Sequence, residues 1–225
     1  MNVHEAIMSR RSVRKFLPTP VPKDSLRRII EGAGMAPSGH NIQPWKLYVI
    51  GGATKDAMSA EILDAIANGD AKDHQPEYPY YPTNWFEPFK TRRRETGFGL
   101  YAALGIGRDD MAAREAQMNR NFEFFDAPIG MFVAFHRELA TGTFMDMGMF
   151  IENILIGARG EGLHTCGQAA FTWYHKIIRH HLKMGDEELL ACGIALGFED
   201  TTAAENKFRV EKLVIEDFTT FMDVE

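Results

Sequence analysis

The chain has 225 residues, with 25 Lys or Arg against 31 Asp or Glu, so its formal net charge is −6. This balance argues against a nucleic-acid-binding protein, which usually carries a basic excess. Hydrophobic residues make up 45% of the chain, as in ordinary globular proteins, and no apolar run reaches the ~18 residues that a membrane-spanning helix needs.

The N-terminal part of the chain predicts helices on both sides of one strand. Asn2, with Glu5 three residues later, forms a capping-box pattern that opens the first helix. The strand covers 46–50 and stops at a pair of glycines, and a further helix covers 54–67. Before this strand, a second helix follows Pro22, and Leu26, Ile29, Ile30 and Ala33 form its apolar face.

Residues 73–90 predict neither a helix nor a central strand, because they include four prolines and six aromatic residues. Helical patterns resume over about 91–104 and 109–122. Long irregular segments in compact domains are usually lids or binding loops. We therefore expect the excursion 73–104 to border a binding site, with a structural arm on a subunit surface as the alternative.

The C-terminal half alternates apolar runs with glycines. Residues 129–135 and 189–196 predict strands buried on both faces. Between them, a helix capped by Thr143 runs to about residue 159 and is apolar around most of its circumference, as in a large core or a subunit interface. A helix over about 173–183 follows, and the tail 207–225 is suited to adding a strand. Because strands do not alternate strictly with helices, we expect an α+β fold rather than a doubly wound sheet.

We expect one domain over residues 1–225, with a C-terminal extension from about 205. With ~150 residues as a typical domain size, the length fits one large domain or at most two small ones. Two cysteines, Cys166 and Cys192, are too few for a disulfide framework. The charged first residues lack the apolar core of a secretion signal, so we expect a cytoplasmic protein.

Two polar motifs in the first part of the chain carry binding chemistry. Residues 10–15, RRSVRK, combine guanidinium groups with a hydroxyl, which suits a phosphate or other anionic oxygens. Residues 37–45, PSGHNIQPW, place amide and hydroxyl side chains between two prolines, where they can bind a flat heterocycle. The alternatives are a solvated basic stretch and a polar turn that satisfies its own backbone.

Two further motifs lie in the second half. In residues 166–171, CGQAAF, small side chains allow a planar ligand to approach the backbone, although a tightly packed loop is the alternative. In residues 206–209, NKFR, an extended backbone would point Lys207 and Arg209 to the same side as a second basic clamp. Two surface charges are the alternative there.

In this order the motifs resemble those of the nitroreductase family of FMN-dependent oxidoreductases. RRSVR at 10–14, PSGHNIQPW at 37–45, the loop GLHTCGQAAF at 162–171 and NKFR at 206–209 carry the resemblance, with FFDAP at 124–128 in support. It spans residues 3 to about 218, and the sequence looks most like bacterial 4-nitrobenzoate reductase-type enzymes. The resemblance implies a three-layer α+β fold, with a central mixed sheet flanked by helices, in an intertwined homodimer.

The resemblance also implies an FMN site at the subunit interface. Arg10 and Ser12 would hold the phosphate with support from Arg11, and Lys207 and Arg209 would close that end. Arg14 would face the pyrimidine edge of the flavin. The partner subunit would contribute Pro37, Ser38, Gly39, Asn41 and Gln43. The backbone of Gln168, Ala169 and Ala170 would lie against the flavin, although the family often has a Glu-Gly pair where this chain has the two alanines.

The function implied is hydride transfer from NAD(P)H to nitroaromatic or quinone-like acceptors by a ping-pong mechanism, with the flavin rather than a side chain carrying the hydride. Trp85, Phe86 and Phe89 are the expected substrate lid. The alternatives are a reductive dehalogenase of the iodotyrosine type and a non-catalytic FMN-binding protein. No metal site is expected from His180 and His181, which are neighbours on a helix. The sequence GFGLYA at 97–102 follows no strand, which argues against a dinucleotide-binding turn.

Overall fold

The computed structural model describes residues 1–224, apart from the side chain of Ala71. Four strands form its sheet in the order β1-β2-β4-β3, and every neighbouring pair is antiparallel. The strands are β1 (Lys46–Gly51), β2 (Ile129–His136), β3 (His164–Gln168) and β4 (Glu188–Gly197). Because β2 and β4 lie in the middle and are almost entirely buried, they form the centre of the core.

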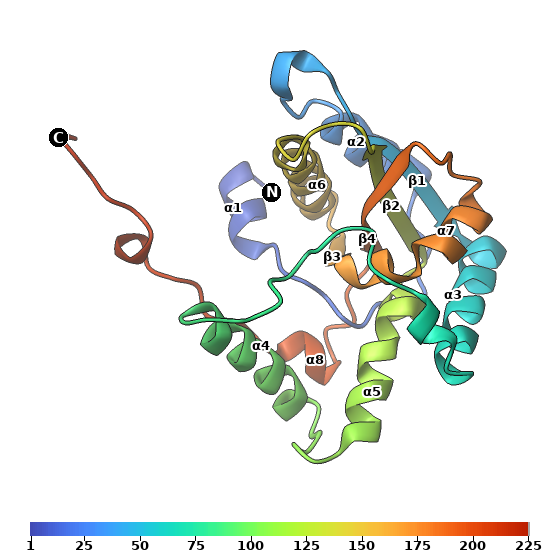
Figure 1. Ribbon diagram of the computed structural model, residues 1–225. Helices are drawn as coiled ribbons and strands as arrows, with labels where there is room; N and C mark the ends of the chain where they lie inside the picture. The colour runs from blue at the N-terminus through green and yellow to red at the C-terminus, as the bar shows by residue number, and fades with distance from the viewer. Residues whose placement is uncertain (225) are drawn as a thin grey trace.

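Helices cover both faces of this sheet, which makes a three-layer α+β fold (Figure 1). The α-helices are α1 (Val3–Ser9), α2 (Lys23–Ala33), α3 (Gly52–Ala67), α4 (Phe89–Ala103), α5 (Met111–Asn119), α6 (Thr143–Gly160), α7 (His175–Leu182) and α8 (Ala204–Lys207). Short 3-10 turns are η1 (Gly39–Asn41), η2 (Asp70–Asp73), η3 (Arg120–Asp126), η4 (Ala169–Tyr174) and η5 (Ile215–Asp217).

The alternation of side chains along β2 explains the two layers of the core. Met131, Val133 and Phe135 pack on the face that α2 and α6 cover, whereas Phe132 and Ala134 pack on the face of α3 and α7. Successive side chains of a strand point to opposite faces, and all five are buried. This confirms the expectation of a strand buried on both faces.

Three details differ from the expectations. The sheet is antiparallel rather than mixed, and the parallel pairing in the described residues is one isolated bridge between Ser12 and Thr165. Residues 164–168, expected as part of a loop, form the edge strand β3. Thr143 does not cap α6, because a turn over 140–143 precedes the helix and makes Thr143 its first residue, after Gly142 as the N-cap.

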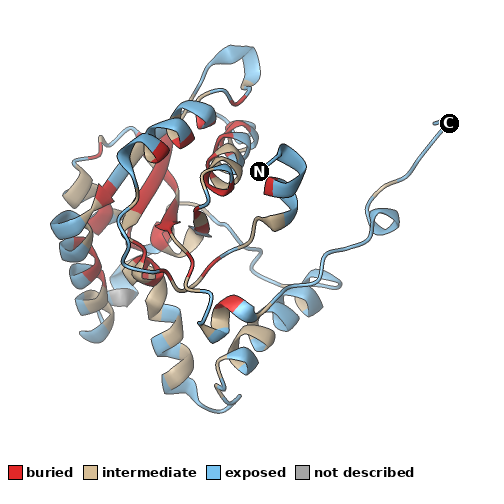
Figure 2. Cartoon of the chain, turned by 180° about the vertical axis from the view of Figure 1, so that it is seen from behind, coloured by how far each residue is buried: buried red, intermediate tan, exposed pale blue. Residues whose placement is uncertain are grey.

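The excursion and the tail lie at the periphery. Residues 74–88 are irregular as expected, and α4 and α5 lie away from the sheet beside α8 (Figure 1). The tail after α8 contains the turn η5 and projects from the body without forming a strand within residues 208–224. Figure 2 shows this tail, α1 and much of α4 as exposed, in contrast to the buried sheet. Across residues 1–224, no helix combines the length and the apolar character needed to cross a membrane.

Candidate functional site

The segment Arg10–Arg14 runs along the free edge of β3. The N–H of Val13 donates to the carbonyl oxygen of Thr165 at 3.0 Å, and the side chain of Val13 is fully buried. Because side chains alternate along an extended segment, Arg11 and Val13 turn inward while Arg10, Ser12 and Arg14 occupy the opposite side. The fold therefore presents two guanidinium groups and a hydroxyl together at the sheet edge.

Arg11 belongs to a buried charged cluster rather than to this exposed row. Its guanidinium pairs with the carboxylate of Glu199, which also lies 3.3 Å from Nε2 of His164. Arg159 lies in the same cluster and donates to the carbonyl oxygen of Leu163 at 2.8 Å. Burial and the two guanidinium groups lower the pKa of His164 to about 4, so its ring is neutral near pH 7. Arg11 thus holds the segment 10–14 against the core through its ion pair with Glu199.

Asn206 joins the two basic motifs. It is buried in α8, its amide oxygen accepts from the N–H of Arg14 at 2.8 Å, and its NH₂ group donates to the carbonyl oxygens of Lys15 at 2.7 Å and Asp200 at 2.9 Å. Lys207 follows directly and is exposed, with no carboxylate within 4.0 Å among the described residues. The guanidinium of Arg209 donates to the carbonyl oxygens of Asn206 and Phe208. NKFR therefore lies beside RRSVR.

The end of β3 completes this region with accessible backbone. Gly167 is exposed, Ala169 and Ala170 are half-buried, and the turn η4 begins directly after Gln168. Gln168 is buried, and its NH₂ group donates to the carbonyl oxygen of Asn121 at 2.6 Å, whereas its amide oxygen has no hydrogen-bond partner among the described residues. The small side chains leave the backbone accessible to a flat ligand.

The loop Pro37–Gln43 lies elsewhere in the chain. The N–H of Gly39 donates to Asp146 in the first turn of α6 at 3.2 Å, whereas Arg159, near the end of α6, donates to Ser9 beside the basic row at 3.2 Å. At about 1.5 Å per residue these two points are about 20 Å apart along the helix. Arg10 itself contacts Glu152, about 9 Å along the helix from Asp146. One chain therefore brings together the motifs at 10–14, 166–170 and 206–209, while the loop at 37–43 is held nearer the start of α6.

The excursion is fixed at its base and exposed beyond it. The carboxylate of Glu77 binds Arg179 at 2.6 Å, Arg137 at 2.8 Å and the N–H of Leu190 at 2.8 Å, and the hydroxyl of Tyr78 donates to the carbonyl oxygen of Ala191 at 2.5 Å. Although burial alone would raise it, the Leu190 N–H and the guanidinium groups hold the pKa of Glu77 below its usual range.

The expected lid residues lie past this anchor. Phe86 and Phe89 are exposed and pack edge to face with ring centroids 5.2 Å apart, while Trp85 is half-buried beneath the guanidinium of Arg93. In α4, Gly99 packs against the ring of Phe208 so closely that no side chain fits between them. This contact places the excursion next to the NKFR motif.

The structure also bears on two kinds of site that the sequence argues against, a dinucleotide-binding turn and a metal site. The residues 97–102 lie inside α4, which is incompatible with a dinucleotide-binding turn between a strand and a helix. His181 pairs with Glu61 at 2.8 Å, and the described part of the chain holds no group of His, Cys, Asp or Glu side chains arranged for a metal ion. Burial raises the pKa of the Cys166 thiol, so this residue is not an activated nucleophile.

The sequence did not single out the residues that fix the site from behind. Three of them belong to separate parts of the chain: Glu199, His164 and Arg159. In the sequence they are recognisable only as charged or polar residues next to apolar segments. Glu77 lies in the proline-rich segment, where no sequence pattern distinguishes it from a solvated carboxylate. Their burial in the fold reveals their role.

Comparison with known proteins places this arrangement in a family. A profile of the nitroreductase family matches residues 7–198. The chain belongs to the nitroreductase family. It is 35% identical to a nitrobenzene nitroreductase of Ectopseudomonas oleovorans over 98% of this chain and 96% of that protein. It is 33% identical to a 4-nitrobenzoate reductase of Pseudomonas putida over 96% of this chain and 93% of that protein.

A solved structure supports the same family. The FMN and NADPH-dependent nitroreductase NfnB from Sphigopyxis sp. strain HMH superimposes with a TM-score of 0.95 at 35% identity, and the alignment covers 100% of both chains. By contrast, an iodotyrosine deiodinase of Danio rerio matches only 24% of this chain and 19% of its own length. The dehalogenase alternative therefore has much weaker support than nitroreduction.

Proposed function

We propose that the protein is an FMN-dependent oxidoreductase that takes hydride from NADPH or NADH and reduces nitroaromatic or quinone-like small molecules. The observation that carries this proposal is the set of hydrogen bonds from Asn206, which brings the RRSVR and NKFR motifs together at the edge of β3. The nitroreductases that match over nearly the whole chain support it.

The residues present fit the phosphate end of FMN. Arg10, Arg14 and Lys207 supply cations, and the exposed Ser12 supplies a hydroxyl on the same side of the segment. Phosphate is a strong acceptor that pairs well with guanidinium and ammonium donors. Arg10 also contacts Glu152 at 3.4 Å, a partly exposed pair that a phosphate could replace at little cost.

The remaining groups suit a flat ring system. When bound, FMN supplies the carrier that receives a hydride from the nicotinamide and delivers it to the acceptor. The backbone of residues 167–170 would lie against the ring, and Arg14 would place a positive charge beside its pyrimidine edge. We assign the hydride chemistry to the flavin and give the protein the tasks of binding, orientation and electrostatics. Donor and acceptor would use the same place in turn, giving parallel double-reciprocal plots.

Substitutions in the basic clamp test the assignment. Arg10→Ala and Lys207→Ala should each weaken FMN binding by roughly 1.5–3 kcal/mol, the size of a hydrogen bond to a charged group. Riboflavin lacks the phosphate, so its affinity for the same variants should stay close to that of the unmodified protein. Fluorescence titration of the apoprotein measures both. If riboflavin binding falls as far as FMN binding, these two side chains do not hold the phosphate.

We further propose that the protein is a homodimer, located in the cytoplasm. The loop Pro37–Gln43 is held at Asp146 in the first turn of α6, whereas Arg10 contacts Glu152 and Ser9 contacts Arg159 further along the same helix. Because the loop and the row meet α6 at different points, we infer that the loop contributes to the FMN site of a second copy. Exposed apolar side chains on α1 and α6 support such an interface, because large exposed apolar patches usually mark interaction sites. They are Val3, Ile7, Met8 and Met145.

Mixed dimers test where the loop acts. The variants Arg10→Ala and Asn41→Ala should each bind FMN poorly. When they are co-expressed in equal amounts, a heterodimer would hold one site with both changes and one site with neither, so about a quarter of all sites should recover. Absence of recovery would show that the two residues serve the same chain's site and would refute the shared arrangement. Sedimentation of the mixture confirms that dimers form.

We also propose that the excursion 73–104 borders the acceptor site and shapes the choice of acceptor. Phe86 and Phe89 are exposed although exposure of such large apolar rings is unfavourable, and Gly99 joins α4 to the NKFR motif. The double variant Trp85→Ala and Phe86→Ala should change the ranking of acceptors by kcat/KM while FMN affinity stays nearly constant. An unchanged ranking with loss of the dimer would identify the segment as a structural arm.

A further inference from the structure

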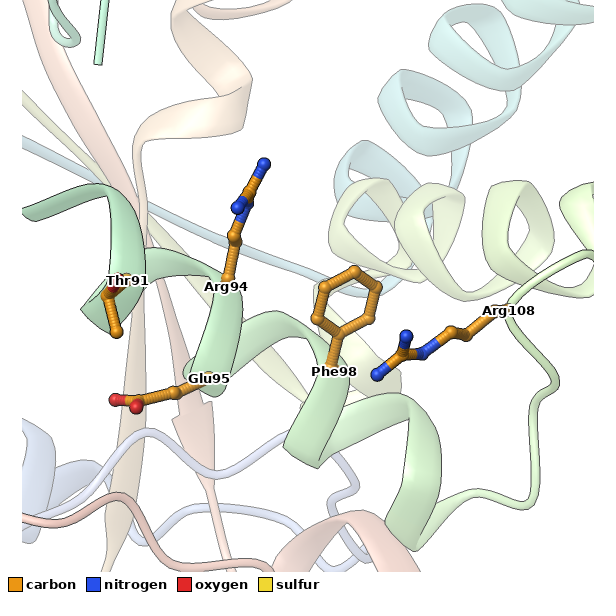
Figure 3. Close-up of a pocket in the computed structure, with 5 residues that line it drawn as sticks. All are labelled: Thr91, Arg94, Glu95, Phe98 and Arg108. Carbon is orange, nitrogen blue, oxygen red and sulfur yellow. The ribbon is translucent and has the colours of Figure 1, made fainter. Parts of the chain in front are cut away.

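A groove runs along α4 and faces the segment that leads to α5. Its first part has a volume of about 560 Å³ and is lined by Thr91, Arg94, Glu95, Phe98 and Arg108. Figure 3 shows the ring of Phe98 between Arg94 and Arg108, with Thr91 and Glu95 on the other side of the helix turn. A second part of about 330 Å³ shares Phe98 and Arg108 and continues past Tyr101, Ile106 and Arg114.

Three arginines give this groove a positive charge. In the region that the structure describes, Arg94, Arg108 and Arg114 have no carboxylate within 4.0 Å, and Glu95 is the one acidic residue in the lining. This local excess of cations contrasts with the net charge of −6 of the chain. An anion is therefore the complementary ligand.

The arginines are held in a way that leaves their donors available. The guanidinium of Arg108 stacks 4.9 Å from the ring of Phe98, and that of Arg114 lies 5.0 Å from the ring of Tyr101. Arg114 also donates to the carbonyl oxygen of Arg108 at 3.0 Å, which ties the two residues together. Stacking uses the face of a guanidinium and leaves N–H groups at its edge to bind a phosphate.

The groove adjoins the basic clamp of the proposed cofactor site. Gly99 lines the second part of the groove and packs directly against Phe208. Phe208 lies between Lys207 and Arg209, so a ligand that reaches from the flavin site can enter the groove along α4. The exposed edges of Phe98, Tyr101 and Ile106 offer an apolar surface for a planar base beside the arginines.

We propose that this groove binds the adenosine half of NADPH, with Arg94 and Arg108 contacting its 2′-phosphate. The proposal rests on the proposed function, because it assigns the electron donor of that reaction. The 2′-phosphate is the group that distinguishes NADPH from NADH, so these arginines determine the preference for NADPH. A carboxylated acceptor offers less charge than a phosphate and no adenine for the apolar part of the groove.

Direct binding and kinetics on the FMN-loaded protein test this assignment. Calorimetry compares adenosine 2′,5′-bisphosphate with adenosine 5′-phosphate on the unmodified protein and on the double variant Arg94→Ala and Arg108→Ala. Steady-state rates with one nitroaromatic acceptor compare NADPH with NADH. The control is Arg27→Ala on α2, which removes one exposed guanidinium far from the groove.

We expect the double variant to lose binding of the bisphosphate and to show a KM for NADPH raised about tenfold or more, since hydrogen bonds to charged groups are lost. Its KM for NADH and its kcat should change little, and Arg27→Ala should resemble the unmodified protein. Equal binding of the bisphosphate to both proteins, equal rises of both KM values, or a rise confined to the KM of a nitrobenzoate acceptor would each overturn the proposal.

These outcomes are separate from failure of the proposed function. A holoenzyme that oxidises neither nucleotide with any nitroaromatic acceptor would refute that function. Binding of the bisphosphate needs no turnover, so its loss in the double variant still decides what the groove binds.

Discussion

Asn206 is a buried side chain on which both the fold and the proposed cofactor site depend. Replacing it with alanine removes three hydrogen bonds, one from the N–H of Arg14 and two to the carbonyl oxygens of Lys15 and Asp200. Each bond contributes about 1 kcal/mol net, and the backbone groups left behind are partly shielded from water. We expect Asn206→Ala to lower the free energy of unfolding by about 3 kcal/mol.

The expected change is large enough to measure by thermal unfolding. For a chain of this length, 1 kcal/mol corresponds to about 2–4 °C in Tm, so Asn206→Ala should unfold about 6–12 °C below the unmodified apoprotein. Samples must be compared at one protein concentration, because association into the proposed homodimer would contribute to stability. The increase in Tm on adding FMN should also shrink, since Lys207 and Arg209 would no longer be held beside Arg10–Arg14.

Two further variants separate the hydrogen bonds from simple loss of volume. Asn206→Asp keeps the acceptor for the Arg14 N–H but turns a carboxylate oxygen toward two carbonyl oxygens, so it should be at least as unstable as the alanine variant. Asn68→Ala removes an exposed amide after α3 and should change Tm little. The reasoning is refuted if Asn206→Ala has the same Tm as Asn68→Ala, or if Asn206→Asp has the same Tm as the unmodified protein.

Two other predictions concern buried charges. Glu77→Ala removes the carboxylate that pairs with Arg137 and Arg179, and leaving partly buried guanidinium groups unpaired should destabilise the protein by about 3 kcal/mol. Urea unfolding measures this loss, and limited proteolysis should cut the excursion faster; unchanged stability and cleavage would contradict the anchoring role. His164 has a folded pKa of about 4, below its unfolded value, so the unfolded state binds the extra proton. Stability should therefore fall as pH drops from about 6.5 to 4, by about 2 kcal/mol after allowing for solvent access. His164→Gln should lack this part of the pH dependence in urea titrations, and identical profiles for the two proteins would exclude it.

Local patterns in the sequence predicted the local structure. The capping box of Asn2 and Glu5 forms as expected, with both reciprocal hydrogen bonds at 2.9 Å, because all its atoms lie within one helical turn. The buried strand at 129–135 follows from a continuous apolar run. Thr143 was predicted as the N-cap because residues 140–142, which form the turn before α6, show no apolar periodicity that would reveal the true start of the helix.

Contacts between distant residues could not be predicted in the same way. The strand β3 contains Gly167 and has few β-branched residues, so its own propensity is weak, and it forms because β4 pairs with it along its length. Asn206 and Arg14 are 192 positions apart. The motifs indicated that both basic segments bind an anion, but their proximity depends on a buried amide whose partners are backbone groups.

The same distinction explains how a negatively charged chain can hold an anionic cofactor. Behind the Arg10–Arg14 row, the cluster of Arg11, Arg159 and Glu199 contains two cations and one carboxylate, since burial keeps His164 neutral. Burial also lowers the pKa of Arg159, which means that its charge is held at a cost. A net positive charge inside the fold, added to the cations at the surface, attracts a phosphate more strongly than exposed arginines alone, because water screens it less.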